Sequence, residues 1–155
     1  MKKILSIVAM SLIALSSLVS CTKATPESVA GTYNYAACDV EYSPSTPETD
    51  AYVSVLKVSA QKSFQGSIIT INADNTATIN LGGANIPTTY TLTPKGEITF
   101  IFGAEITGLP ISSFKGNISG NDLNIVIDAK EYEDAAEEIK KLGFDVCKVK
   151  VTFKK

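Results

Sequence analysis

Apolar and polar positions alternate along much of the chain after residue 66, which predicts strands with one buried and one solvated face. Three pairs of such segments flank short turns: SIITIN and TATINL around ADN, PTTYTLT and EITFIF around PKG, and FKGNIS and LNIVID around GND. Each pair is typical of an antiparallel hairpin. The last segment, CKVKVTF, alternates in the same way and predicts a final strand.

The period changes between residues 129 and 142, where apolar residues recur at helical spacing. The stripe consists of Tyr132, Ala135, Ala136, Ile139 and Leu142. We expect Asp128 to be the N-cap, with Glu131 completing a capping box, and Gly143 to end the helix.

A second helical stripe lies in residues 51–65, where Val53, Leu56, Ala60 and Phe64 recur every three or four positions. This spacing favours a helix, although the segment AYVSV also fits a strand. Before it, GTYNYAAC predicts a first strand, and DVEYSPSTPETD contains the prolines and turn formers of a loop.

About eight strands joined mostly by hairpins, with one or two helices, predict a mainly β fold. Short connections place successive strands side by side, so the simplest architecture is an antiparallel up-and-down barrel. A two-sheet β-sandwich is the alternative.

The N-terminus has the pattern of an exported, lipidated protein. Lys2 and Lys3 precede an uncharged apolar run, and Leu18-Val19-Ser20-Cys21 matches a bacterial lipobox. We therefore expect residues 1–20 to be a signal peptide, residues 21–29 a lipidated N-terminus and tether, and residues 30–155 one β domain. Cys21 would carry acyl chains that anchor the protein in a membrane.

Several of these features together resemble the lipocalin-like lipoproteins of Gram-negative gut bacteria. The resemblance rests on the lipobox, the GTYNY start, the hairpin ITINADNTATINLGG and the late helix before a lysine-bearing last strand. It covers residues 31–155 and implies a lipocalin-like barrel. Gly31-Thr32-Tyr33 stands where true lipocalins have Gly-x-Trp, and the chain has no Arg to pack on that position.

Localisation follows from the residues after the lipobox. Thr22 differs from the Asp that retains some lipoproteins on the inner membrane, and no acidic run follows Cys21. We expect an outer-membrane lipoprotein that faces the periplasm, with display on the cell surface as the alternative.

Composition narrows the range of functions. The chain carries a net charge of −2 and all its basic residues are Lys, which argues against nucleic-acid binding. It has no His, so neither a Ser-His-Asp device nor a His-based zinc site can form. We therefore expect a non-enzymatic protein without a cofactor or a metal ion.

Two groups of polar residues are better explained by structure than by chemistry. The acidic residues of the late helix fit a solvated helix face; they are Glu131, Glu133, Asp134, Glu137 and Glu138. Asn72, Asp74 and Thr76 alternate in a tight hairpin but lack the Gly and distal Glu of a calcium loop, which indicates turn chemistry.

Tyrosine and phenylalanine are the candidates for ligand contact. A barrel of eight strands either is filled or holds one small ligand. A small apolar or amphipathic ligand would contact Tyr33, Tyr35, Tyr90, Phe100 and Phe102. The alternative is a filled core in an interaction protein, such as an inhibitor or an accessory subunit of an envelope complex.

Cys38 and Cys147 remain after lipidation of Cys21, and an even number of cysteines in an exported chain suggests a disulfide. Cys38 ends the predicted first strand and Cys147 begins the last. Because first and last strands close an up-and-down barrel as antiparallel neighbours, we expect these two residues to be bonded.

Overall fold

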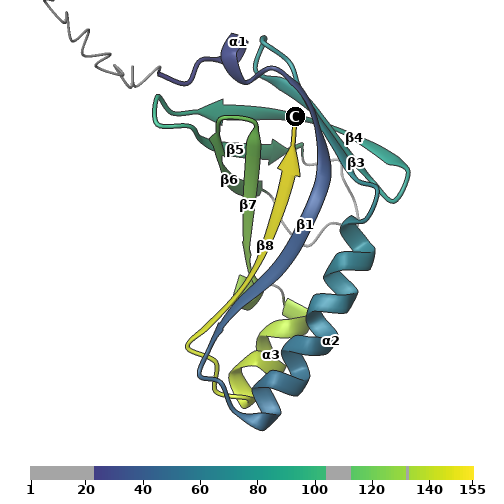
Figure 1. Ribbon diagram of the computed structural model, residues 1–155, viewed down its shortest axis with the longest axis vertical. Helices are drawn as coiled ribbons and strands as arrows, with labels where there is room; N and C mark the ends of the chain where they lie inside the picture. The colour runs from purple at the N-terminus through teal and green to yellow at the C-terminus, as the bar shows by residue number, and fades with distance from the viewer. Residues whose placement is uncertain (1–22, 104–112, 132) are drawn as a thin grey trace, which may run out of the picture.

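The chain folds into a closed barrel of eight antiparallel strands in sequential order, with β1 closing against β8. The structure is a computed structural model and describes residues 23–103, 113–131 and 133–155. Figure 1 shows the barrel in the upper half and, below it, β1 and β8 running on as a long ribbon beside two helices. The strands are β1 Gly31–Ser43, β2 Ile68–Ile71, β3 Thr76–Leu81, β4 Ala84–Leu92, β5 Glu97–Phe102, β6 Ser113–Ser119, β7 Asp122–Asp128 and β8 Val146–Lys154. The up-and-down barrel predicted from the alternation is therefore confirmed.

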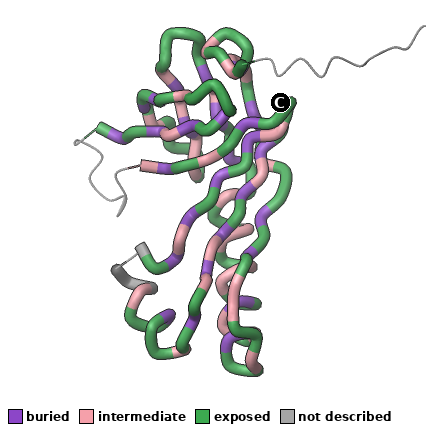
Figure 2. The backbone as a smooth tube through the Cα atoms, turned by 90° about the vertical axis from the view of Figure 1, so that its left-hand side faces the viewer, coloured by how far each residue is buried: buried purple, intermediate pink, exposed green. Residues whose placement is uncertain are grey.

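The three predicted hairpins are all present, as β2–β3, β4–β5 and β6–β7. Buried and exposed residues alternate along the strands, as the change of colour along the tube in Figure 2 shows. In β5, for example, Ile98, Phe100 and Phe102 are buried while Ile101 between them is exposed. The inward residues of all eight strands form one core cluster.

The first strand is longer than predicted. Residues 39–43, which the turn formers had indicated to be a loop, continue β1 because they pair with residues 146–150 of β8. A register shift between Tyr35 and Ala37 separates the part of β1 that pairs with β2 from the part that extends past the barrel. Such irregularities bend a strand and change its twist.

Residues 51–65 lie almost wholly in a helix, which decides the ambiguous segment. Helix α2 Pro47–Phe64 also takes in the last predicted loop residues, because Thr46 is its N-cap and Pro47 stands at its first position. The predicted stripe faces the protein: Val53 is buried, and Leu56, Ala60 and Phe64 pack partly buried against the core.

The core continues into the lower half of the molecule, between the β1–β8 ribbon and the helices. Phe144 is at the centre of this lower core, with ring centroids 6.2 Å from Tyr42 and 5.8 Å from Tyr52. The Tyr42 hydroxyl donates to Asp50 at 2.9 Å and so ties β1 to the start of α2. An ion pair between Lys57 and Asp39, at 2.7 Å, joins the same two elements higher up.

The late helical segment consists of a 3-10 turn, η1 Ala129–Glu131, and helix α3 Glu133–Lys141. Asp128 accepts a hydrogen bond from the Lys130 amide at 3.0 Å and so caps the turn, as predicted for the start of this segment. The predicted single helix is thus two elements. Ile139 is buried in the lower core.

Part of the predicted tether is folded. Residues Pro26–Val29 form the short helix α1, with Thr25 as its N-cap, and Val29 is buried. The Ala24 amide also donates to the Pro94 carbonyl in the β4–β5 turn at 3.0 Å. The Ala24 hydrogen bond and the buried Val29 side chain both hold this segment on the barrel. The chain is therefore attached to the barrel from Ala24 onward.

Candidate functional site

The predicted ligand-contacting residues point into the barrel, but most of them are buried by protein. Tyr33 and Phe100 are 0 % exposed and Tyr90 is 3 % exposed. A side chain that lines a void large enough for water keeps some accessible surface, so Tyr33 and Phe100 touch no such void. These side chains pack against other protein atoms as part of the barrel core.

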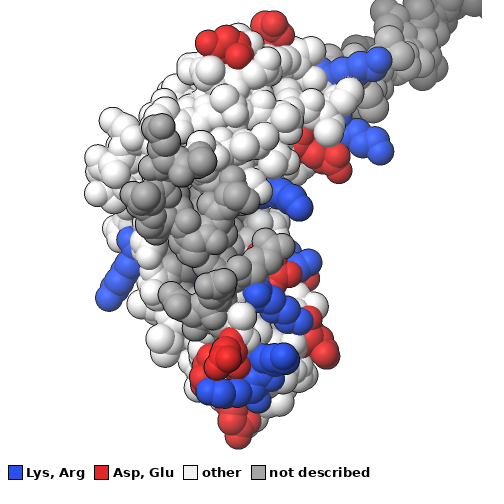
Figure 3. Space-filling view, turned by 180° about the vertical axis from the view of Figure 1, so that it is seen from behind, with Lys and Arg blue, Asp and Glu red and all other residues white. Residues whose placement is uncertain are grey.

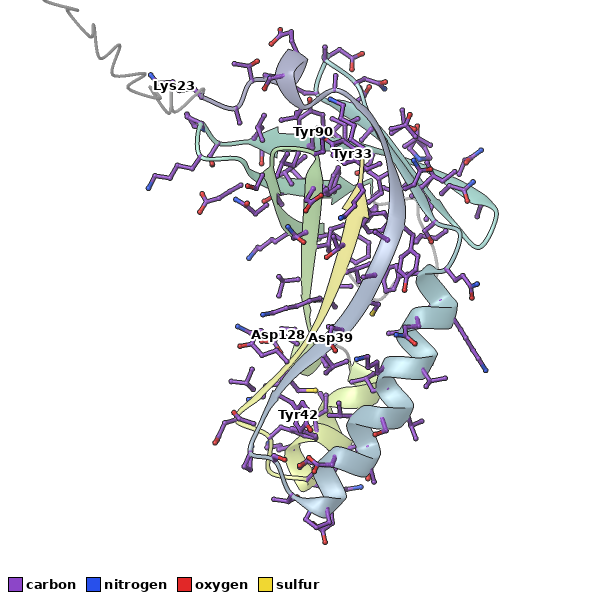
Figure 4. The ribbon with its side chains drawn as sticks, viewed as in Figure 1. Lys23, Tyr33, Asp39, Tyr42, Tyr90 and Asp128 are labelled. Atoms are coloured by element: carbon purple, nitrogen blue, oxygen red, sulfur yellow. The ribbon has the colours of Figure 1, made fainter. Side chains whose placement is uncertain are left out.

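Two of the predicted tyrosines use their hydroxyl groups to hold the fold together. The Tyr33 hydroxyl donates to the Val29 carbonyl at 2.8 Å, and the Tyr90 hydroxyl donates to the Asn72 carbonyl at 2.7 Å. Burial raises the pKa of both phenols, so both stay neutral donors. Figure 4 shows Tyr33 and Tyr90 near each other within the barrel, with Tyr42 far below. Tyr42 therefore does not share a binding surface with Tyr33 and Tyr90.

Tyr35 and Phe102 are the more peripheral members of the predicted set. Tyr35 is half-buried and meets Phe153 edge to face, with ring centroids 6.2 Å apart. Phe102 packs edge to face on Phe114 at 5.1 Å and retains 8 % exposure. Phe102 also lines an open groove on the barrel.

This groove, with a volume of about 460 Å³, crosses strands β3, β4 and β5. We call it the β3–β5 groove; its lining residues are Asn72, Thr76, Ala77, Thr78, Pro87, Thr88, Thr89, Ile101, Phe102 and Gly103. Strand register explains the grouping, since Thr89 pairs with both Thr76 and Ile101. Pro87 and Thr89 are exposed and alternate with buried Thr88 and Tyr90, so the groove lies on the solvent side of the sheet.

The chemistry of the β3–β5 groove is suited to contact. Hydroxyl groups from four threonines and the Asn72 amide supply hydrogen-bonding groups, and Ile101, 43 % exposed, supplies apolar surface. Some of these groups are already engaged: the Thr76 hydroxyl donates to Asp74 at 2.6 Å and accepts from Asn72 at 2.9 Å. The described lining holds no ionisable side chain, so it offers hydrogen bonds and apolar contact without an acid or a base.

The sequence did not identify this groove. Its exposed side chains are the outward residues of the same alternation whose inward residues were predicted as ligand contacts. Threonine on a strand's outer face is ordinary β composition and carries no functional signal by itself. The predicted strand PTTYTLT contains Pro87 and Thr89, which are exposed and alternate with buried Thr88 and Tyr90, but nothing in the sequence joins them to residues of the neighbouring strands.

The predicted disulfide between Cys38 and Cys147 is wrong. Both thiols are free and buried. Cys38 pairs with Val151 and Cys147 with Tyr42, so the two cysteines stand four residues apart along the β1–β8 ladder. At about 3.3 Å per residue this is a separation of ~13 Å, well beyond the reach of a disulfide. Burial raises the pKa of both thiols.

Charged groups are spread over the molecule. Figure 3 shows acidic and basic side chains together at the lower end of this face, with further acidic side chains at the top and basic ones at the sides. Asp74 is engaged within its own hairpin, accepting from the Thr76 amide and hydroxyl, which confirms the turn chemistry predicted there. Within the ranges that the structure describes, no three Asp, Glu or Cys residues are placed to hold a metal ion. None of the helices in these ranges combines the length and apolarity needed to cross a bilayer.

No family model, curated protein or solved structure matches the chain. The residues themselves therefore carry the functional argument.

Proposed function

We propose that this protein is a lipid-anchored, non-enzymatic envelope protein that binds a partner on the outer surface of a filled barrel. The observation that carries this proposal is the interior: Tyr33, Phe100 and Leu123 are 0 % exposed. A barrel filled in this way acts as a rigid scaffold, and contact with other molecules takes place outside it. The surface that best fits such contact is the β3–β5 groove.

The preferred partner is another envelope protein. Threonine hydroxyls beside exposed Ile101 and Pro87 give the groove the mixture of polar and apolar surface found in non-obligate protein interfaces. A second candidate is a small amphipathic ligand, because about 460 Å³ lies within the usual size of small-molecule sites. A ligand held inside the barrel among Tyr33, Tyr35, Tyr90, Phe100 and Phe102 stays a prediction, which the packing of this core disfavours.

Anchoring through acylated Cys21 belongs to the same proposal. Ala24 is bonded to the Pro94 carbonyl, so three residues, spanning roughly 10 Å at most, connect Cys21 to the barrel. An acyl anchor at Cys21 would therefore hold the α1 end of the barrel close to the membrane. The opposite end of the molecule, which carries α2 and α3, would point away from the membrane (Figure 1). We infer an outer-membrane location facing the periplasm, as the lipobox context predicts.

Anchoring is tested by replacing Cys21 with Ala in cells that make the full chain. We expect the variant to leave the membrane fraction, or to stay there only as an uncleaved precursor. A Cys21→Ala protein of mature size that still fractionates with membranes would refute the anchoring.

The binding site is tested with a photo-crosslinking residue in place of Thr89, and with the same residue in place of Asn124 on the outer face of β7 as the control. Discrete cross-linked protein bands from position 89 alone would support the protein partner. An organic compound that co-purifies with the protein, and is lost in an Ile101→Lys variant, would support the small ligand. If neither a cross-linked band nor a co-purifying compound is found, the groove is eliminated as a binding site.

A further inference from the structure

Three neighbouring strands of the barrel carry no charged residue. Among the eight strands that the structure describes, β2, β3 and β4 contain no Asp, Glu or Lys, whereas each of the other five contains at least one. The outward side of these three strands is nevertheless open to solvent: Thr89 and Thr91 are exposed, and Ile68 is 38 % exposed. Charged residues at about 25–35 % of the surface keep a domain soluble. A three-stranded face without any charge is therefore better suited to contact with another molecule than to water alone.

Strand pairing joins the outward residues of β2, β3 and β4 into rows. Thr70 of β2 pairs with Thr78 of β3, which in turn pairs with Pro87 of β4. The next row joins Thr76 of β3 to Thr89 of β4. Because neighbouring strands lie about 4.8 Å apart, these side chains form one continuous patch. We call this patch the uncharged face; its main residues are Thr70, Thr76, Thr78, Pro87, Thr89 and Thr91.

Charged side chains border the uncharged face without entering it. Asp74 lies in the turn between β2 and β3, and Glu97 and Lys115 lie beyond the face on β5 and β6. All three are exposed. Protein interfaces have this anatomy, with few charges in the buried centre and a polar, solvated rim.

We propose that the protein partner of the β3–β5 groove covers the whole uncharged face and meets it with an uncharged surface of its own. This inference rests on the proposed function and extends its site from the groove to Thr70 on β2 and Thr91 on β4. An ionised group of the partner placed on this face would lose its water without gaining a counter-charge, which costs free energy. The partner's contact surface therefore consists of apolar side chains, neutral polar side chains and backbone groups.

The threonines are able to meet such a surface with their hydroxyl groups. The Thr76 hydroxyl is already bonded to Asp74. In the part of the chain that the structure describes, the hydroxyls of Thr70, Thr89 and Thr91 are bonded to no other group. A hydroxyl both donates and accepts, so each of them can pair with a carbonyl or an amide of the partner. The outward side of the three strands presents no aromatic ring on which a sugar could stack, which favours a protein over a glycan.

The position of the uncharged face also fits a partner in the same envelope. Figure 1 shows β3 and β4 along one side of the upper half of the molecule, below α1. Under the proposed anchoring the α1 end faces the bilayer, so the side of the barrel stays open to a neighbouring protein.

The extent of the interface is tested with photo-crosslinking residues at Thr70 and Thr91, which lie outside the groove lining, beside the variants at Thr89 and Asn124. In cells that make the full chain, we expect the same cross-linked protein band from positions 70, 89 and 91 and none from position 124. A band from position 89 alone would overturn this inference and leave the groove as the binding site. Cross-linked material that only a muramidase removes would identify a glycan and overturn the protein partner.

An introduced charge tests the chemistry of the interface. With the photo-crosslinking residue at position 89, Thr78→Lys should lower the yield of the protein band severalfold, because the covered ammonium group finds no counter-charge. Asn117→Lys places the same group on the exposed outer side of β6 and should leave the yield unchanged. Far-UV circular dichroism shows that each variant is folded. A folded Thr78→Lys variant that cross-links as well as the parent would contradict an uncharged interface.

Salt provides an independent measurement on envelopes isolated from the same cells. Between about 0.01 M and about 1 M salt the Debye length falls from about 30 Å to about 3 Å, which screens interactions between charges. An uncharged interface should keep its cross-linking yield at position 89 within twofold over this range. A yield that falls severalfold would show that ion pairs hold the partner and would overturn the inference, while the groove itself would remain the binding site.

Discussion

Single residues with unusual backbone geometry set the turns of this barrel, and Gly96 is the most constrained of them. It has φ = +86° in the β4–β5 turn, and a Cβ there would overlap the carbonyl oxygen of Ile118. A left-handed conformation alone costs an L residue about 1–2 kcal/mol. We expect Gly96→Ala to lower the free energy of unfolding by more than about 2 kcal/mol in urea titrations.

Gly82 provides the matched control for that variant. Its φ is +57°, but nothing lies within 4 Å of the added Cβ. Gly82→Ala should therefore cost only about 1 kcal/mol, the conformational part of the effect. Similar losses in the two variants would show that overlap with Ile118 does not matter.

The buried hydroxyl of Tyr33 gives a second prediction at the residue scale. Tyr33→Phe removes the donor to the Val29 carbonyl and leaves that acceptor unpaired near the end of the barrel. We expect a loss of about 1–2 kcal/mol in the free energy of unfolding. In the part of the chain that the structure describes, the Tyr35 hydroxyl makes no hydrogen bond, so Tyr35→Phe should stay within about 0.5 kcal/mol. A neutral Tyr33→Phe would mean that water replaces the bond.

At the scale of elements, helix α2 depends on the cap at its start. The Thr46 side chain accepts from the Thr49 amide at 3.2 Å, and the Thr49 hydroxyl accepts from the Thr46 amide at 2.8 Å. Thr46→Ala should cost about 1 kcal/mol and speed amide hydrogen exchange in the first turn of α2. Ser63→Ala, near the exposed end of the same helix, should change neither quantity. An unchanged exchange rate in Thr46→Ala would show that packing alone holds the first turn.

The elements were predictable where the pattern is local. Hairpins appear in sequence as two alternating segments around a turn, so β2–β3, β4–β5 and β6–β7 could all be placed. Residues 39–43 could not, because what keeps them in β1 is pairing with β8, more than a hundred residues later. The predicted disulfide failed for the same reason: closure of the barrel was foreseen, but the four-residue offset between Cys38 and Cys147 depends on long-range register.

The candidate site was the least predictable part of the molecule. Alternation correctly placed Phe100 on the inner face, but it contains no information on whether inner faces meet or leave a space. That outcome depends on barrel size and packing across the axis. The groove arises from three strands whose outward residues come together only in the fold. The outward direction of Val55 on α2, which leaves this side chain 70 % exposed, is likewise set by the fold.

The whole molecule should lose stability in alkali. The pKa values of Tyr33, Tyr90, Cys38 and Cys147 are all raised in the fold, in each case mainly by burial. The unfolded chain therefore ionises first, so this stability is intact below the unfolded values, about 8.5 for Cys and 10 for Tyr, and falls as pH rises above them. Urea midpoints should decline from pH 8 to pH 11, and less steeply in Tyr33→Phe. A constant midpoint would contradict the burial of these groups.

Counting thiols tests the covalent state of the whole chain in one measurement. The chain has three cysteines, of which Cys38 is 5 % exposed and Cys147 0 % exposed, and both are free. Burial and a raised pKa keep the reactive thiolate form of both cysteines scarce. The thiols of the native protein from membranes should therefore react with a chromogenic disulfide reagent only as fast as the protein unfolds. In denaturant we expect two thiols per chain, because an acylated Cys21 contributes none. Three would refute acylation at Cys21, and fewer than two would mean that oxidation links cysteines which the β1–β8 register keeps apart.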